Sequence, residues 1–277
     1  MKKVFFIIMT SALLLVCQGC SENLLMGDER VEPLATDVNH HDNVTRYQEQ
    51  ARWGDGKAYL KLASCYHEGL GVERNLLLTM SMVKMAVLYG GINSWMDFFL
   101  SLPDDDPDRL LVEALEDASK GRYDEVLQKA ELMDKLGIAD ADFVRALTRK
   151  GGSNIEEEMA LLHNAKRKGS VLAGLVISIA KDERLAMEEY AEQMPILYCE
   201  LARECHKSGY DSEIEEQTAN LYRKADERLC LDYNGAKWLL SYYEHQAEIG
   251  KPIVDDQEIC RLRSLVEKLK ANNKASY

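Results

Sequence analysis

Apolar and small residues recur with a helical period in the segment from Gly54 to Gly90. The positions that share this period in its first half are Ala58, Leu62, Ala63 and Tyr66. Because a helix has 3.6 residues per turn, their spacings of four, one and three residues place all four on one face. The pattern therefore predicts a helix with one buried face, where the alanines keep a partner helix close.

Glycine and asparagine residues mark the expected helix ends in the same segment. Gly69 and Gly71 follow the first helix, where a residue that adopts positive φ is favoured. Asn75 then offers a side-chain oxygen that caps a second helix, and Gly90 closes that helix. The expected inward positions of the second helix are Thr79, Met82, Val83 and Ala86. A single pair of helices in 37 residues cannot bury such faces alone, so neighbouring copies are expected.

This pattern resembles the Sel1-like repeat, a relative of the tetratricopeptide repeat. The resemblance lies in GDGKAYLKLASCYHEGLGVERN and in the Ala86 and Gly90 that end the second helix. It implies a solenoid in which helical hairpins stack side by side. The repeat-defining positions are Gly54, Ala58, Leu62, Ala63, Tyr66, Gly69, Gly71, Asn75, Ala86 and Gly90.

Weaker copies follow this first one. The segment NIEEEMALLHNAKRKG contains Asn154, Ala165 and Gly169. Their spacing is the same as that of Asn75, Ala86 and Gly90 in the second helix of the first copy. The expected repeats cover residues 54–90, 137–169, 169–209 and 221–270. An ordinary irregular helical bundle remains the alternative for the later half, because the Gly-rich loop does not recur there.

Helical periodicity continues through most of the chain, which has only five prolines in 277 residues. The fold class we expect is all-α, with a right-handed superhelix of antiparallel helices. Pro195 should interrupt the helical segment in which it lies. The expected helices are 46–52, 56–68, 76–89, 94–102, 108–119, 123–135, 139–149, 155–168, 172–182, 184–205, 213–230, 235–246 and 255–271.

Two charged segments carry finer expectations. The run from Asp104 to Asp106 lies between two prolines and predicts a solvated loop, after which Asp108 caps a helix. The final helix is expected to close the solenoid by turning its basic residues outward. These residues are Arg261, Arg263, Lys268 and Lys270.

The amino terminus has the pattern of a secretory signal peptide over residues 1–19. Lys2 and Lys3 precede an uncharged run that is too short to span a bilayer as a helix. Gly19 and Cys20 resemble the processing site of bacterial lipoproteins, although Cys17 and Gln18 depart from the usual residues. The resemblance implies lipidation of Cys20, and Ser21 implies sorting to the outer membrane. An uncleaved anchor or ordinary cleavage is the alternative.

The segment 20–45 is polar and predicts a flexible tether, followed by a repeat domain over residues 46–277. His40 and His41 lie near two aspartates, but neighbouring side chains in a tether give poor geometry for a metal, and a polar linker is the simpler interpretation. No metal site and no cofactor are therefore expected.

The acidic charge excludes one class of partner. Removal of the signal peptide takes away two lysines and no carboxylate, so the formal charge falls from −13 to about −15. Phosphate backbones and anionic headgroups would be repelled. We therefore expect no nucleic-acid binding, and membrane attachment through acyl chains alone.

Catalytic motifs are missing from the sequence. It contains no phosphate-binding glycine loop, nucleophile elbow or zinc-binding HExxH pair. Five cysteines follow Cys20, an odd number, and most are expected to be buried, although a link from Cys199 or Cys205 to Cys230 is conceivable. The five are Cys65, Cys199, Cys205, Cys230 and Cys260.

These observations favour a noncatalytic, membrane-anchored scaffold that binds an unidentified protein partner in the bacterial cell envelope. An envelope enzyme or glycan-acting accessory would instead need titratable groups gathered in a groove, and a carbohydrate-binding protein would need aligned, exposed rings. The aromatic residues considered for such exposure are Tyr59, Trp95, Tyr198 and Trp238.

Overall fold

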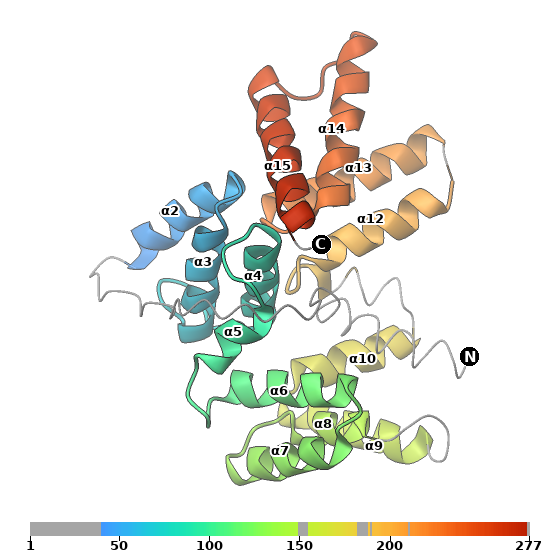
Figure 1. Cartoon of the computed structure of the whole chain (residues 1–277). Coiled ribbons are helices and arrows are strands. Elements are labelled where there is room, and N and C mark those ends of the chain that lie inside the picture. The colour runs from blue at the N-terminus through green and yellow to red at the C-terminus, as the bar shows by residue number, and fades with distance from the viewer. Residues whose placement is uncertain (1–39, 149–154, 182–187, 189, 210, 276–277) are drawn as a thin grey trace. The chain divides into compact units, whose positions relative to one another are not determined.

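The computed structural model describes residues 40–148, 155–181, 188, 190–209 and 211–275. In this part of the chain every regular element is an α-helix, thirteen in all, and no strand occurs (Figure 1). The all-α class is therefore confirmed. Each of these helices is too short or too polar to cross a lipid bilayer. Cys20 and Asn154, expected as the lipidation site and as a repeat position, lie outside the described residues.

The helices group into two compact units. The first unit contains α6 (Pro107–Ser119), α7 (Tyr123–Lys135), α8 (Ala141–Leu147), α9 (Ile155–Lys168) and α10 (Val171–Lys181). The second contains α2 (His40–Arg52), α3 (Gly56–Glu68), α4 (Leu76–Leu88), α12 (Leu197–Lys207), α13 (Ser212–Glu227), α14 (Tyr233–Glu248) and α15 (Asp256–Ala275). A short helix, α5 (Trp95–Leu100), carries the sequence boundary between the units.

Periodicity located most helices to within a few residues, and α3, α7 and α9 have the predicted bounds. The clearest difference is α2, which begins at His40, so residues 40–45 are helical rather than part of a tether. The reason is a buried stripe: Val44, Tyr47 and Ala51 share one face of α2, which packs against α3.

The hairpin of α3 and α4 has the predicted local chemistry. The side chain of Asn75 accepts a hydrogen bond of 3.1 Å from the backbone N–H of Leu78, which caps α4. Gly69 ends α3 with φ of 74°, and its N–H bonds to the carbonyl of Cys65. The predicted inward residues are buried in this hairpin, apart from the half-buried Tyr66.

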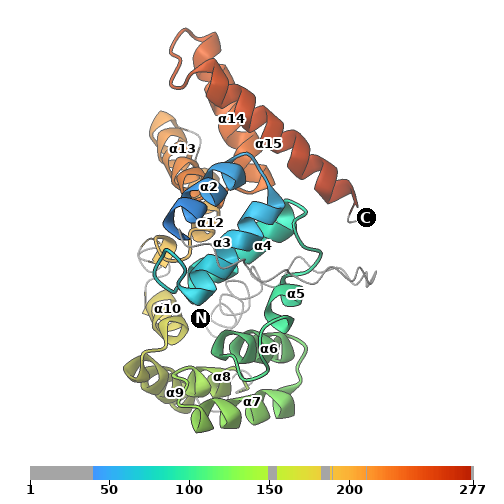
Figure 2. The same ribbon diagram turned by 90° about the vertical axis from the view of Figure 1, so that its left-hand side faces the viewer.

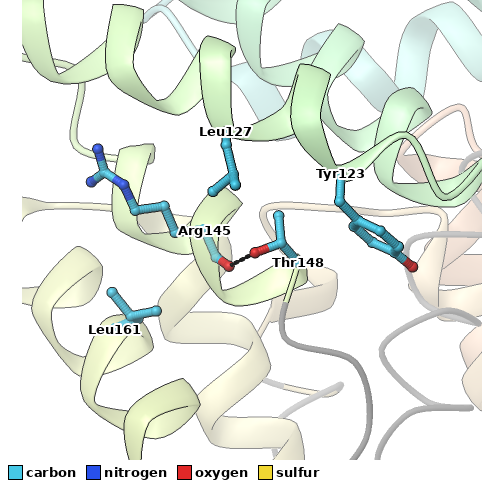
Figure 3. Close-up of a pocket in the computed structure, with 5 residues that line it drawn as sticks. All are labelled: Tyr123, Leu127, Arg145, Thr148 and Leu161. Atoms are coloured by element: carbon cyan, nitrogen blue, oxygen red, sulfur yellow. Dashed lines mark hydrogen bonds between the residues drawn. The ribbon is translucent and has the colours of Figure 1, made fainter.

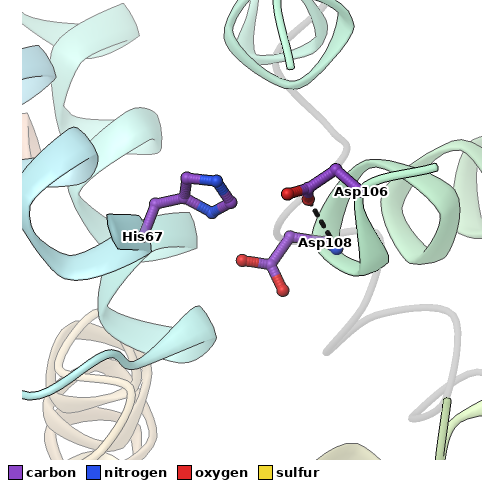
Figure 4. Close-up of side chains that lie close together, drawn as sticks. All are labelled: His67, Asp106 and Asp108. Carbon is purple, nitrogen blue, oxygen red and sulfur yellow. Dashed lines mark hydrogen bonds between the residues drawn. The ribbon is translucent and has the colours of Figure 1, made fainter. Parts of the chain in front are cut away.

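Helix α6 corrects one expected cap. Asp106, not Asp108, precedes the helix, and its Oδ1 accepts hydrogen bonds from the backbone N–H groups of Asp108 at 2.9 Å and Arg109 at 3.2 Å (Figure 4). Pro107 decides the register, because a proline has no N–H to satisfy and fits the first helical position. Pro195 acts as expected, since α12 begins two residues after it.

The first unit follows chain order. Helix α6 packs on α7, α7 on α8, α8 on α9 and α9 on α10, with a further contact between α6 and α8. Small residues occupy the helix contacts, among them Ala146, Ala165 and Ala173, all buried. Gly169 has φ of 103° in the tight connection between α9 and α10. Helices that follow one another in the chain therefore pack on one another in this unit.

The second unit joins two segments that are far apart in sequence. Helix α15 packs on both α14 and α4 (Figure 2). The Tyr89 hydroxyl, at the end of α4, donates a 3.2 Å hydrogen bond to the carbonyl of Leu231, and Asn272 Nδ2 donates one of 3.2 Å to the carbonyl of Leu88. The predicted hairpin therefore finds packing partners from the carboxyl-terminal helices, in addition to α2.

One basic residue expected at the surface is buried in this unit. Arg261 is only 3% exposed: it donates to the carbonyl of Arg52 at 3.1 Å and forms an ion pair of 2.5 Å with Asp226. The expectation that Arg261 faces outward on a terminal cap is therefore wrong. Tyr59, Trp95 and Tyr198 are also buried, whereas Trp238 is partly exposed.

Candidate functional site

A pocket of about 370 Å³ opens among three helices of the first unit (Figure 3). Its lining residues come from α7, from α8 with the residue that ends it, and from α9. They are Tyr123, Leu127, Arg145, Thr148 and Leu161. Both its size and its mostly apolar lining fall within the range of ordinary binding pockets.

The amphipathic pattern of each helix creates this pocket. On α7, Val126, Ala130 and Met133 are fully buried, which leaves Tyr123 and Leu127 one turn apart on a neighbouring strip. On α9, Leu162 is buried and the adjacent Leu161 is only partly covered. The apolar side chains outside the core contacts therefore line the opening.

The end of α8 supplies the polar part of the lining. The Thr148 hydroxyl donates a 2.8 Å hydrogen bond to the carbonyl of Arg145, so its methyl group remains the apolar contribution (Figure 3). Arg145 stretches between two carboxylates: it donates to Asp142 at 2.8 Å and to Asp134. Its hydrogen bond with Asp134, followed by the one with Asp142, raises the pKa of its guanidinium.

The buried carboxylate of Asp142 anchors an ion-pair network that includes the pocket residue Arg145. Lys168 donates to it at 2.7 Å, and Arg145 and Asn164 also donate to it. Burial by itself would raise the pKa of Asp142, but the hydrogen bonds from Lys168, Arg145 and Asn164 outweigh this and hold the pKa below its ordinary value. The positive charge of Arg145 is thus already balanced.

Among the described residues, the lining contains no histidine, cysteine or carboxylate. The polar groups among these residues are the hydroxyls of Tyr123 and Thr148 and the guanidinium of Arg145. What the lining offers is an apolar depression with a fixed, neutralised guanidinium at its edge. Such a surface can receive an aliphatic or aromatic side chain from another molecule.

The predicted repeat residues lie elsewhere. Those described by the structure occupy helix contacts, caps and turns, and none lines the pocket. Sequence reasoning missed the pocket residues, although one signal was present. Leu127 and Leu132 on α7, and Leu136 just after it, are exposed leucines that lie off the periodic stripe that the core uses.

The cysteines are structural. Cys65, Cys199 and Cys230 are buried, Cys205 is partly exposed and Cys260 is exposed; all five are free thiols. The conceivable link between Cys199 and Cys230 is absent: the Cys199 thiol instead donates a 3.3 Å hydrogen bond to the carbonyl of Cys230. Burial raises the pKa of Cys65 to about 11, so this thiol is not activated.

An aromatic cluster in the second unit surrounds Trp238. Its ring stacks on Tyr242 with centroids 5.4 Å apart and planes 12° apart, Tyr222 lies at 5.5 Å, and His206 meets it edge-on at 5.9 Å. The indole therefore has protein rings on several sides. It is not a flat, open platform of the kind on which a sugar ring stacks.

A scan against protein-family models and searches of curated proteins and of solved structures find no match to this chain. The fold and the pocket together define an all-helical protein in two units, with a small apolar binding depression in the unit of α6 to α10.

Proposed function

We propose that this protein is a noncatalytic scaffold that binds another protein through its helical hairpins, while a lipidated Cys20 holds it at the bacterial cell envelope. The observation that carries the proposal is the pocket formed by Tyr123, Leu127 and Leu161, which has a mostly apolar lining. Helical arrays commonly bind partner segments on surfaces of this kind.

The sequence supports the same proposal in two ways. The segment from Gly54 to Gly90 resembles a Sel1-like repeat, and stacked repeats of this type imply protein binding. The amino terminus resembles that of a lipoprotein, which favours the outer membrane. The perturbed titratable groups near the pocket do not suggest chemistry, because Asp142 and Arg145 are satisfied by each other and by their neighbours.

Site-specific photocrosslinking in living cells tests the binding role. A photoreactive phenylalanine derivative replaces Leu127, which is 40% exposed and lines the pocket, or Leu132, which is 38% exposed on another face of the same helix. We expect a discrete protein adduct from position 127 and not from position 132. Reproducible absence of adducts from position 127 would contradict the proposal.

The anchor is tested separately. In a Cys20→Ala variant the acyl chains cannot attach, so the product should appear in the soluble fraction or remain an unprocessed precursor. Unchanged partitioning into detergent would contradict lipidation.

Glycan binding, as an accessory to an envelope enzyme or as a carbohydrate-binding protein, is the alternative. It has less support, because Trp238 is packed among other rings and the described residues that line the pocket include no carboxylate. Sedimentation of the purified protein with isolated envelope glycan, combined with failed crosslinking, would favour the alternative.

A further inference from the structure

We propose that the pocket of α7, α8 and α9 receives a basic amphipathic segment of a protein partner, in which a bulky apolar side chain is flanked by lysine or arginine. This inference rests on the proposed binding function and names the chemistry of the occupant. It follows from two features of one surface, an apolar floor and an acidic rim.

The floor needs an apolar occupant. Leu127 and Leu161 reach it from opposite helices, with the ring of Tyr123 and the methyl of Thr148 beside them (Figure 3). Exposed apolar groups in a depression gain free energy when another apolar side chain displaces water from them. A volume of about 370 Å³ accommodates one or two such side chains.

The rim is negative on both flanking helices. On α7, Glu131 lies one turn after Leu127, on the same face, and it is exposed. On α9, Glu158 lies one turn before Leu161, again on the same face. Asp134 adds a third carboxylate, which contacts the pocket residue Arg145.

Two cations at this surface are already held in ion pairs. Arg145 is held by Asp134 and Asp142, and Lys168 by Asp142 at 2.7 Å. These two carboxylates and two cations sum to zero charge. Together, the described residues of α7, α8 and α9 carry eight carboxylates and six cations, a formal charge of −2 to which Glu131 and Glu158 contribute.

Glu158 adds a second indication to this charge balance. It is partly buried, and burial alone raises its pKa, with no cation among the described residues acting to lower it. A desolvated carboxylate beside an apolar depression becomes more stable when a cation approaches. A lysine or arginine next to the inserted apolar side chain would supply that charge, whereas an acidic segment would be repelled.

The test is binding of designed peptides to the full-length protein in detergent, measured by fluorescence anisotropy. One labelled helical peptide carries leucines on one face and lysines beside them, and its counterpart replaces every lysine by glutamate. We expect the lysine peptide to bind at least about tenfold more tightly and to lose affinity as salt is raised. Equal binding of both peptides would overturn the inference.

Matched variants locate the binding. Leu127→Lys should weaken the lysine peptide about tenfold or more, whereas Leu132→Lys, an equally exposed site on another face of α7, should not. Glu158→Gln should weaken it about two- to fivefold, whereas Glu156→Gln, the same charge change on another face of α9, should have little effect. Equal losses within either pair would overturn the assignment to this pocket.

The two proposals fail differently. If position 127 crosslinks to a protein in cells but the lysine peptide does not bind, the scaffold function stands and the basic occupant is wrong. If neither experiment detects binding, both proposals fail.

Discussion

At the scale of single residues, the burial of charged side chains could not be predicted from the sequence. Asp142 is an ordinary aspartate in the sequence, yet its side chain is only 8% exposed and receives donors from α8 and α9. Loss of the Asp142 charge would leave Arg145 and Lys168 without this ion-pair partner, which costs stability. Asp142 therefore links the fold of the first unit to the geometry of Arg145 in the pocket.

Asp142→Asn should lower the free energy of unfolding at pH 7 by about 1–3 kcal/mol, because hydrogen bonds to a charged group are lost. The pKa of Asp142 is lowered in the folded protein from 3.8. Its contribution is therefore fully present well above that pH and is lost as the pH falls through the lower, folded value.

Denaturant unfolding followed by circular dichroism at pH 7 and near pH 3 measures this difference. The wild type should lose more stability on acidification than the variant does. Asp105→Asn, a change at an exposed aspartate in the same unit, serves as the control and should behave like the wild type. An equal acid response in Asp142→Asn would contradict the assignment.

The thiols give a second prediction at this scale. In the native protein, iodoacetamide should modify Cys260 first and Cys205 more slowly, because exposure controls access. Cys65, Cys199 and Cys230 should react only after unfolding, since burial also raises the pKa of each thiol. Peptide mass spectrometry gives the order. Native modification of Cys199 at the rate of Cys260 would contradict it.

At the scale of elements, helix bounds and most caps follow from local chemistry. Asn75 and Gly69 act where the sequence places them, because capping depends on a side chain and on the backbone next to it. Asp106 was overlooked because it and Asp108 flank Pro107, and either could be assigned by residue type alone. Because Pro107 has no N–H, it occupies the first helical position, and the residue before it, Asp106, is therefore the cap.

Glycine contacts between elements were not predictable from residue type. A Cβ on Gly56, in the first turn of α3, would lie 2.3 Å from the backbone nitrogen of Gly91 and 2.6 Å from the carbonyl oxygen of Tyr89. The start of α3 and the residues just after α4 are therefore in direct backbone contact, with no side chain between them. The sequence shows both glycines, but only the fold shows that they meet.

Gly56→Ala should therefore destabilise the protein by about 2–4 kcal/mol, because backbone atoms must move to admit the methyl group. Gly209→Ala is the control, since its Cβ would meet only the flexible end of Ile214 and should cost about 1 kcal/mol or less. Thermal unfolding of both variants measures the effect. Equal melting temperatures of the two variants would show that the backbone at Gly56 does not lie this close to the backbone of Tyr89 and Gly91.

At the scale of the whole molecule, the second unit depends on contacts between sequence-distant segments. Tyr89 bonds to Leu231, Arg261 to the backbone of Arg52, and Asn272 to the backbone of Leu88. Gly54 fits because a side chain there would meet Leu265 and Tyr89. The hairpin that the repeat pattern identified is thus completed by the carboxyl-terminal helix.

Ending the chain after Gly250 should therefore expose the hairpin at residues 54–90. Hydrogen exchange in α4, and in α3 that packs on it, should rise by about tenfold or more, because the contact of α4 with α15 is lost. Helices α6 to α9 belong to the other unit and should retain their protection. Increased exchange limited to residues near the new end would contradict this arrangement.

The sequence by itself determined the helical class, the approximate helix bounds, the faces that are buried and most of the turns. These depend on the period of apolar residues and on caps, both of which are local along the chain. The tertiary structure alone decided that α15 packs on α4, that Arg261 is buried, and that Leu127 and Leu161 share a pocket. Such features require particular faces of distant helices to meet, and periodicity shows that a face is buried without specifying its partner.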